Sequence, residues 1–149
     1  MKTALSRFCH RHWRKMLLLA ALPVLAACEN SATAFMVDGK DHALILVREQ
    51  KTFWNDEVKQ AIIVSRLPRC QKRVTIHPGS SRLVEIRVYE AGDNLWALHQ
   101  GRDWYLASTQ VCQVQDWDNA GDQPPGGYVG RFALSQGEPV FIAAEAEVR

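Results

Sequence analysis

The sequence has no long apolar run and none of the short motifs that assign a reaction. Its longest apolar stretch, Met16–Ala27, is shorter than the about 20 residues that a membrane-spanning helix needs. Ser108 and Thr109 lie in no G-x-S-x-G context, the histidines form no H-E-x-x-H, and no glycine-rich loop precedes a helix. These absences exclude the motif-defined serine hydrolases, zinc proteases and phosphate-binding loops.

Acidic residues are missing from the N-terminal segment. Residues 1–15 contain five basic side chains and no acidic one, and the apolar run Met16–Ala27 follows directly. A basic segment, an apolar segment of about 7–15 residues and small residues at its end are typical of a secretory signal peptide. The sequence therefore predicts export, with the basic segment on the cytoplasmic side of the membrane.

The apolar run ends in Leu-Ala-Ala-Cys, residues 25–28. This stretch resembles the lipobox of bacterial lipoproteins. The resemblance implies that the Cys28 thiol receives a diacylglyceryl group, that the chain is cleaved before Cys28, and that the new amine is acylated. Cys28 is thus a predicted lipidation site. An ordinary signal peptide cleaved near Ala27 is the alternative.

The resemblance also implies a location. Several acyl chains hold a protein on a membrane almost permanently. In enterobacterial lipoproteins an aspartate after the lipidated cysteine favours the inner membrane, so Glu29 favours the outer membrane. We therefore expect a lipid-anchored protein of the bacterial cell envelope that faces the periplasm. Residues 39–117 also resemble uncharacterised lipoproteins of proteobacteria, a resemblance that implies no activity.

Three segments are predicted. Residues 1–27 form the lipoprotein signal peptide, residues 28–41 a lipidated tether of mostly small and polar residues, and residues 42–149 one β-rich globular domain. Removal of the signal peptide leaves 13 basic side chains against 16 acidic ones. This balance gives no indication of a nucleic-acid partner.

Few cysteines are left for the domain. Of the four in the chain, Cys9 leaves with the signal peptide and Cys28 carries the lipid, so Cys70 and Cys112 remain. Two thiols in an oxidising periplasm predict a disulfide between them. Two unpaired thiols are the alternative. A zinc site is disfavoured because such sites usually contain two closely spaced cysteines.

The apolar residues recur mostly with a period of two, which is typical of β-strands. Arg82–Glu90 shows the pattern most clearly; at Glu57–Arg66 a helix competes, but β-branched residues favour a strand. The predicted fold class is all-β or β-rich, a small single-domain antiparallel sandwich or barrel. Further strands are expected at 42–53, 71–76, 95–99, 103–107, 109–115, 128–134 and 140–144, and loops at 77–81 and 116–127.

The loop 116–127 contains Asp116, Asp118 and Asp122, whose near-alternate spacing is compatible with a calcium site. An EF-hand would need a bidentate glutamate where Gly127 stands, so we prefer a solvated turn. Each remaining histidine (His42, His77 and His99) is isolated in the sequence. We therefore predict no metal site, no catalytic residue and no cofactor.

Trp104 and Tyr105 are adjacent in a predicted strand, so their side chains must point to opposite faces of the sheet. Either one of them is exposed or the sheet is covered on both sides. An exposed aromatic ring beside Arg102 would suit a glycan, a peptide or a protein. Arg102, Trp104 and Tyr105 are therefore the candidate binding surface.

The sequence thus favours a non-catalytic binding or accessory module of the envelope. Its expected partners are the membrane, through the N-terminal lipid, and an envelope protein or a glycan. The alternative is a small hydrolase or a metal-dependent periplasmic protein. A pocket that holds a histidine beside a carboxylate would favour the alternative, whereas a flat aromatic patch would favour binding.

Overall fold

The computed structural model describes residues 30–51, 54–82 and 85–147, so the predicted signal peptide and Cys28 lie outside the described residues. The described chain forms ten strands and one helical turn: β1 (Asn30–Asp38), β2 (His42–Glu49), β3 (Glu57–Arg66), β4 (Cys70–Ser80), β5 (Ile86–Gly92), β6 (Leu95–Gln100), β7 (Asp103–Ser108), β8 (Gln113–Asp116), β9 (Tyr128–Ser135), β10 (Glu138–Ala143) and α2 (Ala144–Glu147). No helix among the described residues is long and apolar enough to cross a membrane.

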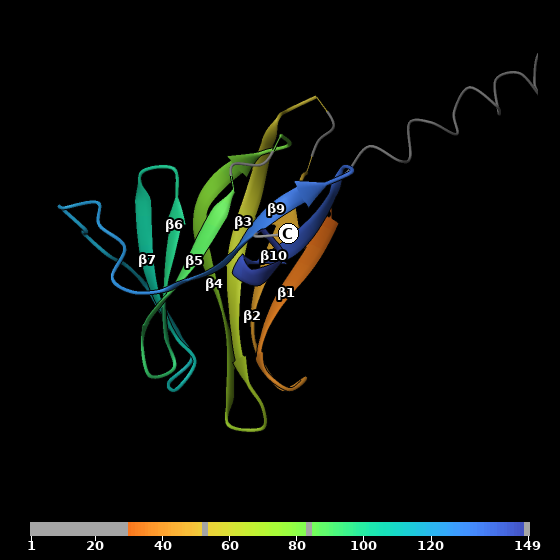
Figure 1. Cartoon of the computed structure of the whole chain (residues 1–149). Helices are drawn as coiled ribbons and strands as arrows, with labels where there is room; N and C mark the ends of the chain where they lie inside the picture. Colours follow the sequence, from red (N-terminus) through yellow and green to blue (C-terminus); the bar gives the residue numbers. More distant parts are fainter. Residues whose placement is uncertain (1–29, 52–53, 83–84, 148–149) are drawn as a thin grey trace, which may run out of the picture.

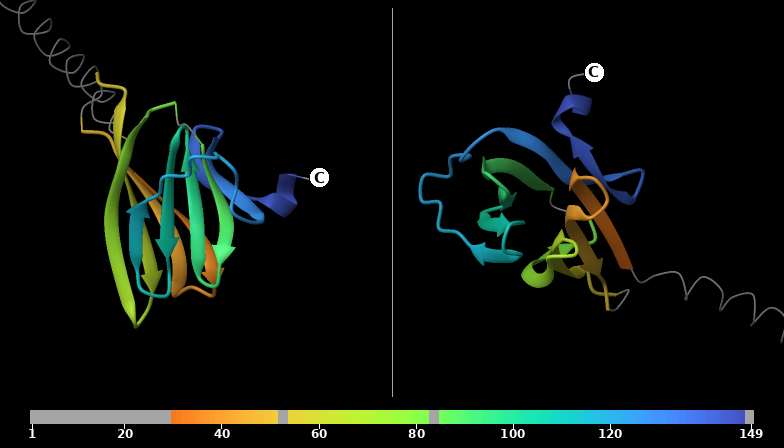
Figure 2. Two further views of the ribbon diagram at one scale, coloured as in Figure 1. Left: turned by 90° about the vertical axis from the view of Figure 1, so that its left-hand side faces the viewer. Right: turned by 90° about the horizontal axis from the view of Figure 1, so that it is seen from below.

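The strands form two antiparallel sheets that lie face to face (Figures 1 and 2). The first has the order β1-β2-β3-β4 and the second β10-β9-β5-β6-β7-β8. Both contribute to one core, because alternate residues of each strand point inward. Its fully buried members include Leu44, Leu46, Ile62, Val64, Ile86, Val88, Leu98 and Phe132. The predicted β-rich, antiparallel single domain is confirmed, in the form of a two-sheet sandwich.

The two sheets are also joined where their edges meet. At one edge, the Thr33 hydroxyl of β1 donates a hydrogen bond to the Pro139 carbonyl of β10 (3.1 Å), and Phe35 stacks on Phe141. At the other edge, a disulfide links Cys70, the first residue of β4, to Cys112 in the turn before β8. The predicted Cys70–Cys112 pair is therefore present.

The predicted tether is wrong from residue 30 onward, because Asn30–Asp38 forms β1 and pairs with β2 from Asn30↔Glu49 to Asp38↔His42. Small and polar residues have weak intrinsic strand preference, which is why the segment resembled a linker. Alternate side chains are nevertheless half-buried, and Phe35 and Val37 pack against the core. A turn at residues 39–41 connects β1 to β2, so the folded domain includes residues 30–41, which the prediction assigned to the tether.

Two further boundaries differ from the prediction. Residues 77–80, expected as a loop, extend β4, and the pairing with β3 shifts register between Val58 and Gln60. Gly79 lies close to Gln60 there, and a Cβ atom would lie 2.6 Å from the Gln60 side chain, which would have to shift. Residues 109–112, expected as strand, form a turn in which Cys112 has a φ of 51°.

The other strands lie close to their predicted places. Glu57–Arg66 is a strand and not a helix. The hairpin between β6 and β7 turns at Gly101, whose φ of 64° suits glycine. Residues 83–84 of the predicted strand Arg82–Glu90 lie outside the described residues, and β5 begins at Ile86.

Candidate functional site

A cleft of about 270 Å³ opens near one end of the edge where β4 approaches β7 and β8. It brings together side chains from β4, from the β6–β7 hairpin, from β7, and from the end of β8 and the loop that follows. The lining residues are His77, Arg102, Asp103, Trp104, Tyr105, Asp116, Trp117 and Asp118. We call this the edge cleft. It contains every residue of the candidate binding surface and two of the three aspartates that were considered as calcium candidates.

Trp104 and Tyr105 reach the edge cleft from opposite faces of β7. Tyr105 belongs to the core between the sheets, where it is 2% exposed. Trp104 lies on the outer face in a small cluster with Tyr89 and Ala97 and is 5% exposed. Of the two predicted alternatives, the sheet is covered on both sides, and neither ring is a free surface platform.

The Tyr105 hydroxyl holds His77 in place across the two sheets. It accepts a hydrogen bond from the His77 backbone N–H (3.1 Å) and lies 2.7 Å from Nδ1 of the His77 ring. When the neutral ring carries its proton on Nε2, the Tyr105 hydroxyl donates to Nδ1. Burial raises the pKa of Tyr105, so the hydroxyl keeps its proton at neutral pH.

Carboxylates outnumber cationic groups in the edge cleft. Asp103, Asp116 and Asp118 are opposed by Arg102 alone when His77 is neutral. The Asp103 carboxylate lies 3.7 Å from Nδ1 of His77, too far for a hydrogen bond but close enough to attract a protonated ring. The cleft is therefore net acidic and offers more hydrogen-bond acceptors than donors.

The loop 117–127 is fixed to the outer face of the second sheet beside the cleft. The Trp104 indole N–H donates to Asp122 Oδ1 at 2.8 Å. His99 stacks on the Trp104 ring with 4.1 Å between ring centroids, and Trp117 meets it edge-on at 5.7 Å. The loop must cross this face because it connects β8, at one side of the sheet, to β9 near the other. These contacts hold Trp117 at the cleft.

The three aspartates that were considered as calcium candidates do not converge. Asp116 and Asp118 line the edge cleft, whereas Asp122 accepts a hydrogen bond from the Trp104 indole N–H. Within the ranges that the structure describes, no three histidine, cysteine, aspartate or glutamate side chains are gathered to hold a metal ion. The loop is thus organised by an indole–carboxylate hydrogen bond.

The three histidines of the domain lie in different surroundings. His77 lines the cleft, and His99 is stacked on Trp104. His42 is buried at the opposite end of the sandwich, where its Nε2 lies 2.6 Å from the Thr109 hydroxyl. Burial lowers the pKa of His42, and the nearby charge of Arg66 lowers it further while Asp38 opposes the shift. Only His77 is placed to meet a ligand in the cleft.

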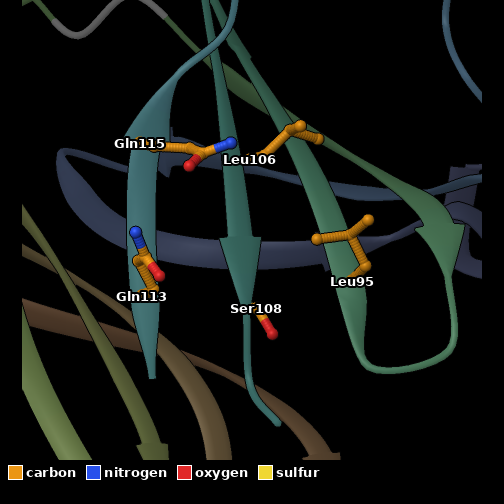
Figure 3. Close-up of a pocket in the computed structure, with 5 residues that line it drawn as sticks. All are labelled: Leu95, Leu106, Ser108, Gln113 and Gln115. Carbon is orange, nitrogen blue, oxygen red and sulfur yellow. The ribbon is translucent and has the colours of Figure 1, made fainter. Parts of the chain in front are cut away.

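A second, smaller hollow of about 170 Å³ lies on the outer face of the second sheet (Figure 3). Its lining residues come from β6, β7 and β8: Leu95, Leu106, Ser108, Gln113 and Gln115. Figure 3 shows these side chains spread across three neighbouring strands rather than converging on one point. The hollow contains no ionisable group, so it offers apolar contact and amide hydrogen bonds but no acid–base chemistry.

Local sequence reasoning missed His77 and Asp103 as site residues. The cleft residues from Arg102 to Asp118 lie within 17 consecutive positions, but His77 comes from the other sheet. No spacing rule connects residues that meet only through sheet packing. Comparisons with protein families, curated proteins and solved structures find no match.

Proposed function

We propose that the protein is a lipid-anchored, periplasm-facing protein of the bacterial envelope, attached to the outer rather than the inner membrane. The support is the sequence of residues 1–29: a basic segment, an apolar segment, Leu-Ala-Ala-Cys and then Glu29. The anchored domain is a binding or accessory module. Its ligand site is the edge cleft.

The observation that carries the binding role is the convergence of three carboxylates and Trp117 on one cleft. Carboxylates accept hydrogen bonds and attract cations, and an indole adds apolar and cation–π contact. These groups suit a ligand that carries a positive charge and donor groups. Among envelope partners, a lysine or arginine side chain of a protein fits this chemistry better than a neutral glycan. The volume admits one such side chain rather than a large substrate.

A small hydrolase is the second candidate, because the edge cleft does place His77 near the Asp103 carboxylate. Catalysis would require His77 to accept a proton. The Tyr105 hydroxyl lies 2.7 Å from Nδ1, whereas the Asp103 carboxylate is 3.7 Å away and does not orient the ring as a catalytic base requires. In addition, no serine, threonine or cysteine is among the described residues that line the cleft. These two points favour binding.

Nuclear magnetic resonance titration of the isotope-labelled protein tests the site and its ligand class. A lysine-containing peptide should shift the Trp117 indole resonance, and added salt should weaken the effect because the attraction is electrostatic. Asp116→Asn combined with Asp118→Asn should weaken binding several-fold. Asp93→Asn, an exposed aspartate in the β5–β6 turn at the other end, is the matched control. Shifts with peptidoglycan fragments but not with the peptide would favour a glycan.

The hydrolase candidate has its own test. Ester, amide and glycoside substrates are incubated with the native protein and with His77→Asn. If the native protein turns over a substrate and the variant does not, the cleft is a catalytic site rather than a binding site.

A further inference from the structure

The first strand begins directly after the predicted anchor. Asn30 is the first residue of β1 and pairs with Glu49 at the end of β2. Cys28 lies two positions before Asn30, and consecutive Cα atoms are about 3.8 Å apart, so the two residues are separated by at most about 8 Å. If Cys28 carries acyl chains, as proposed above, the end of the sandwich at which β1 begins must lie against the bilayer.

That end presents the most exposed aromatic side chain among the described residues. Trp54, in the loop between β2 and β3, is 75% exposed. Trp54 shortly precedes β3, which pairs with β2 at Glu49↔Lys59, so it lies at the end of the molecule at which β1 begins (Figure 1). Lys51 lies in the same loop, and the backbone N–H of Ser81 donates to the Asp56 carbonyl (2.9 Å), which brings Arg82 beside it.

The other exposed apolar side chains that lie in turns are at the opposite end. Leu67 is in the β3–β4 turn and Val111 in the β7–β8 turn, 49% and 64% exposed. A strand of eight residues such as β2 is about 26 Å long. When the domain stands on the end at which β1 begins, these two side chains are therefore held away from the membrane, and they provide an internal comparison for Trp54.

We propose that Trp54 docks on the lipid bilayer, with its indole in the headgroup region and the charges of Lys51 and Arg82 near the lipid phosphates. Tryptophan is enriched at membrane–water interfaces because its ring is apolar while its N–H still finds partners. The anchor keeps the loop at the surface, so even a weak contact forms. The contact fixes how the domain stands on the membrane, which an acyl anchor alone leaves free to rotate.

Fluorescence quenching by labelled lipid tests the docking. The full lipidated protein is purified from membranes and reconstituted in vesicles of phosphatidylethanolamine and phosphatidylglycerol, with or without lipid that carries a nitroxide near the headgroup. The nitroxide should quench part of the tryptophan emission of the native protein, and Trp54→Phe should abolish this quenching. The substitution is at an exposed site, so the melting temperature should not change.

A second variant provides the matched control. Val111→Trp, added to Trp54→Phe, places an exposed indole at the opposite end and should restore no quenching. Equal quenching of native protein and Trp54→Phe, or strong quenching of the Val111→Trp protein, would overturn the docking while leaving the anchor in place. A mass spectrum without acyl chains, together with protein that does not stay on the vesicles, would overturn the anchor itself and the docking that depends on it.

Discussion

Cys70 and Cys112 form a disulfide that ties the first sheet to the second at the edge shared by β4 and β8, with 6.0 Å between their Cα atoms. The Tyr105–His77 hydrogen bonds tie the same edge further along β4. The edge cleft lies beside this second tie. Its shape therefore depends on contacts between the sheets, and each of the two ties can be removed separately.

Loss of the disulfide should lower stability strongly. The bond closes a loop with a sequence separation of 42, which disfavours the unfolded chain by roughly 4 kcal/mol in the chain-entropy treatment. For a domain of this size, that corresponds to a fall of roughly 10–20 °C in melting temperature. Calorimetry of Cys112→Ser, and of native protein with and without reductant, measures it.

The same samples provide the controls. Reductant should not destabilise Cys112→Ser further, since the bond is already absent. Denatured, unreduced protein should show no reactive thiol at Cys70 or Cys112. Two reactive thiols at these positions in periplasmic material would contradict the pairing.

Tyr105→Phe should destabilise the protein by about 1–2 kcal/mol, because it leaves the backbone N–H of His77 without its partner. His77→Ala keeps that N–H bonded to the Tyr105 hydroxyl and should cost less. Urea unfolding of the two variants gives the comparison. If Tyr105→Phe were as stable as the native protein, the hydroxyl would not be the tie between β4 and β7.

Stability should fall as the pH drops below about 6.5, the ordinary pKa of histidine. The pKa of His42 is lowered in the folded state, chiefly by burial. The folded protein therefore binds the proton less well than the unfolded chain. The contribution of neutral His42 to the free energy of unfolding is complete above that pH and is lost as the pH falls below it. Urea midpoints measured from about pH 8 to about pH 5 should fall less for His42→Gln than for the native protein. Equal pH dependence in both would contradict this role.

Cys28→Ser should leave the protein unlipidated and either released from membranes or unprocessed, because the thiol is the group that receives the lipid. Metabolic labelling with a palmitate analogue, followed by membrane fractionation, checks the outcome. Label that persists on the substituted protein would place the acyl chain elsewhere.

Most strands could be predicted because a half-buried strand must alternate apolar and polar residues. This rule located β3, β6, β7, β9 and β10, with their turns at glycine-containing positions. It failed for β1, where Ser31 and Thr33 occupy inward positions that the pattern expects to be apolar. It failed again after His77, because Pro78 and Gly79 usually end a strand, whereas here the strand continues and Gly79 lies against the Gln60 side chain.

The cleft itself was only half predictable. Arg102, Trp104 and Tyr105 were candidates because they are neighbours in the chain, and Asp116 and Asp118 because of their spacing. From the sequence, the aromatic surface and the aspartates of the loop were two separate features. They meet because β7 and β8 pair with Tyr105 opposite Asp116, and this register depends on the turn at residues 109–112, which the pattern placed in a strand. His77 joins them only through packing of the two sheets.

Site-specific photocrosslinking in intact cells tests most directly whether the edge cleft is where the protein meets its partner. A photoreactive amino acid replaces Arg102, a cleft residue that is not one of the carboxylates, or, as the control, Asp93 in the turn at the other end of the sandwich. We predict one discrete crosslinked protein from position 102, absent from position 93 and reduced when Asp118→Asn is added. No product from position 102, or the same products from both positions, would contradict binding at the cleft.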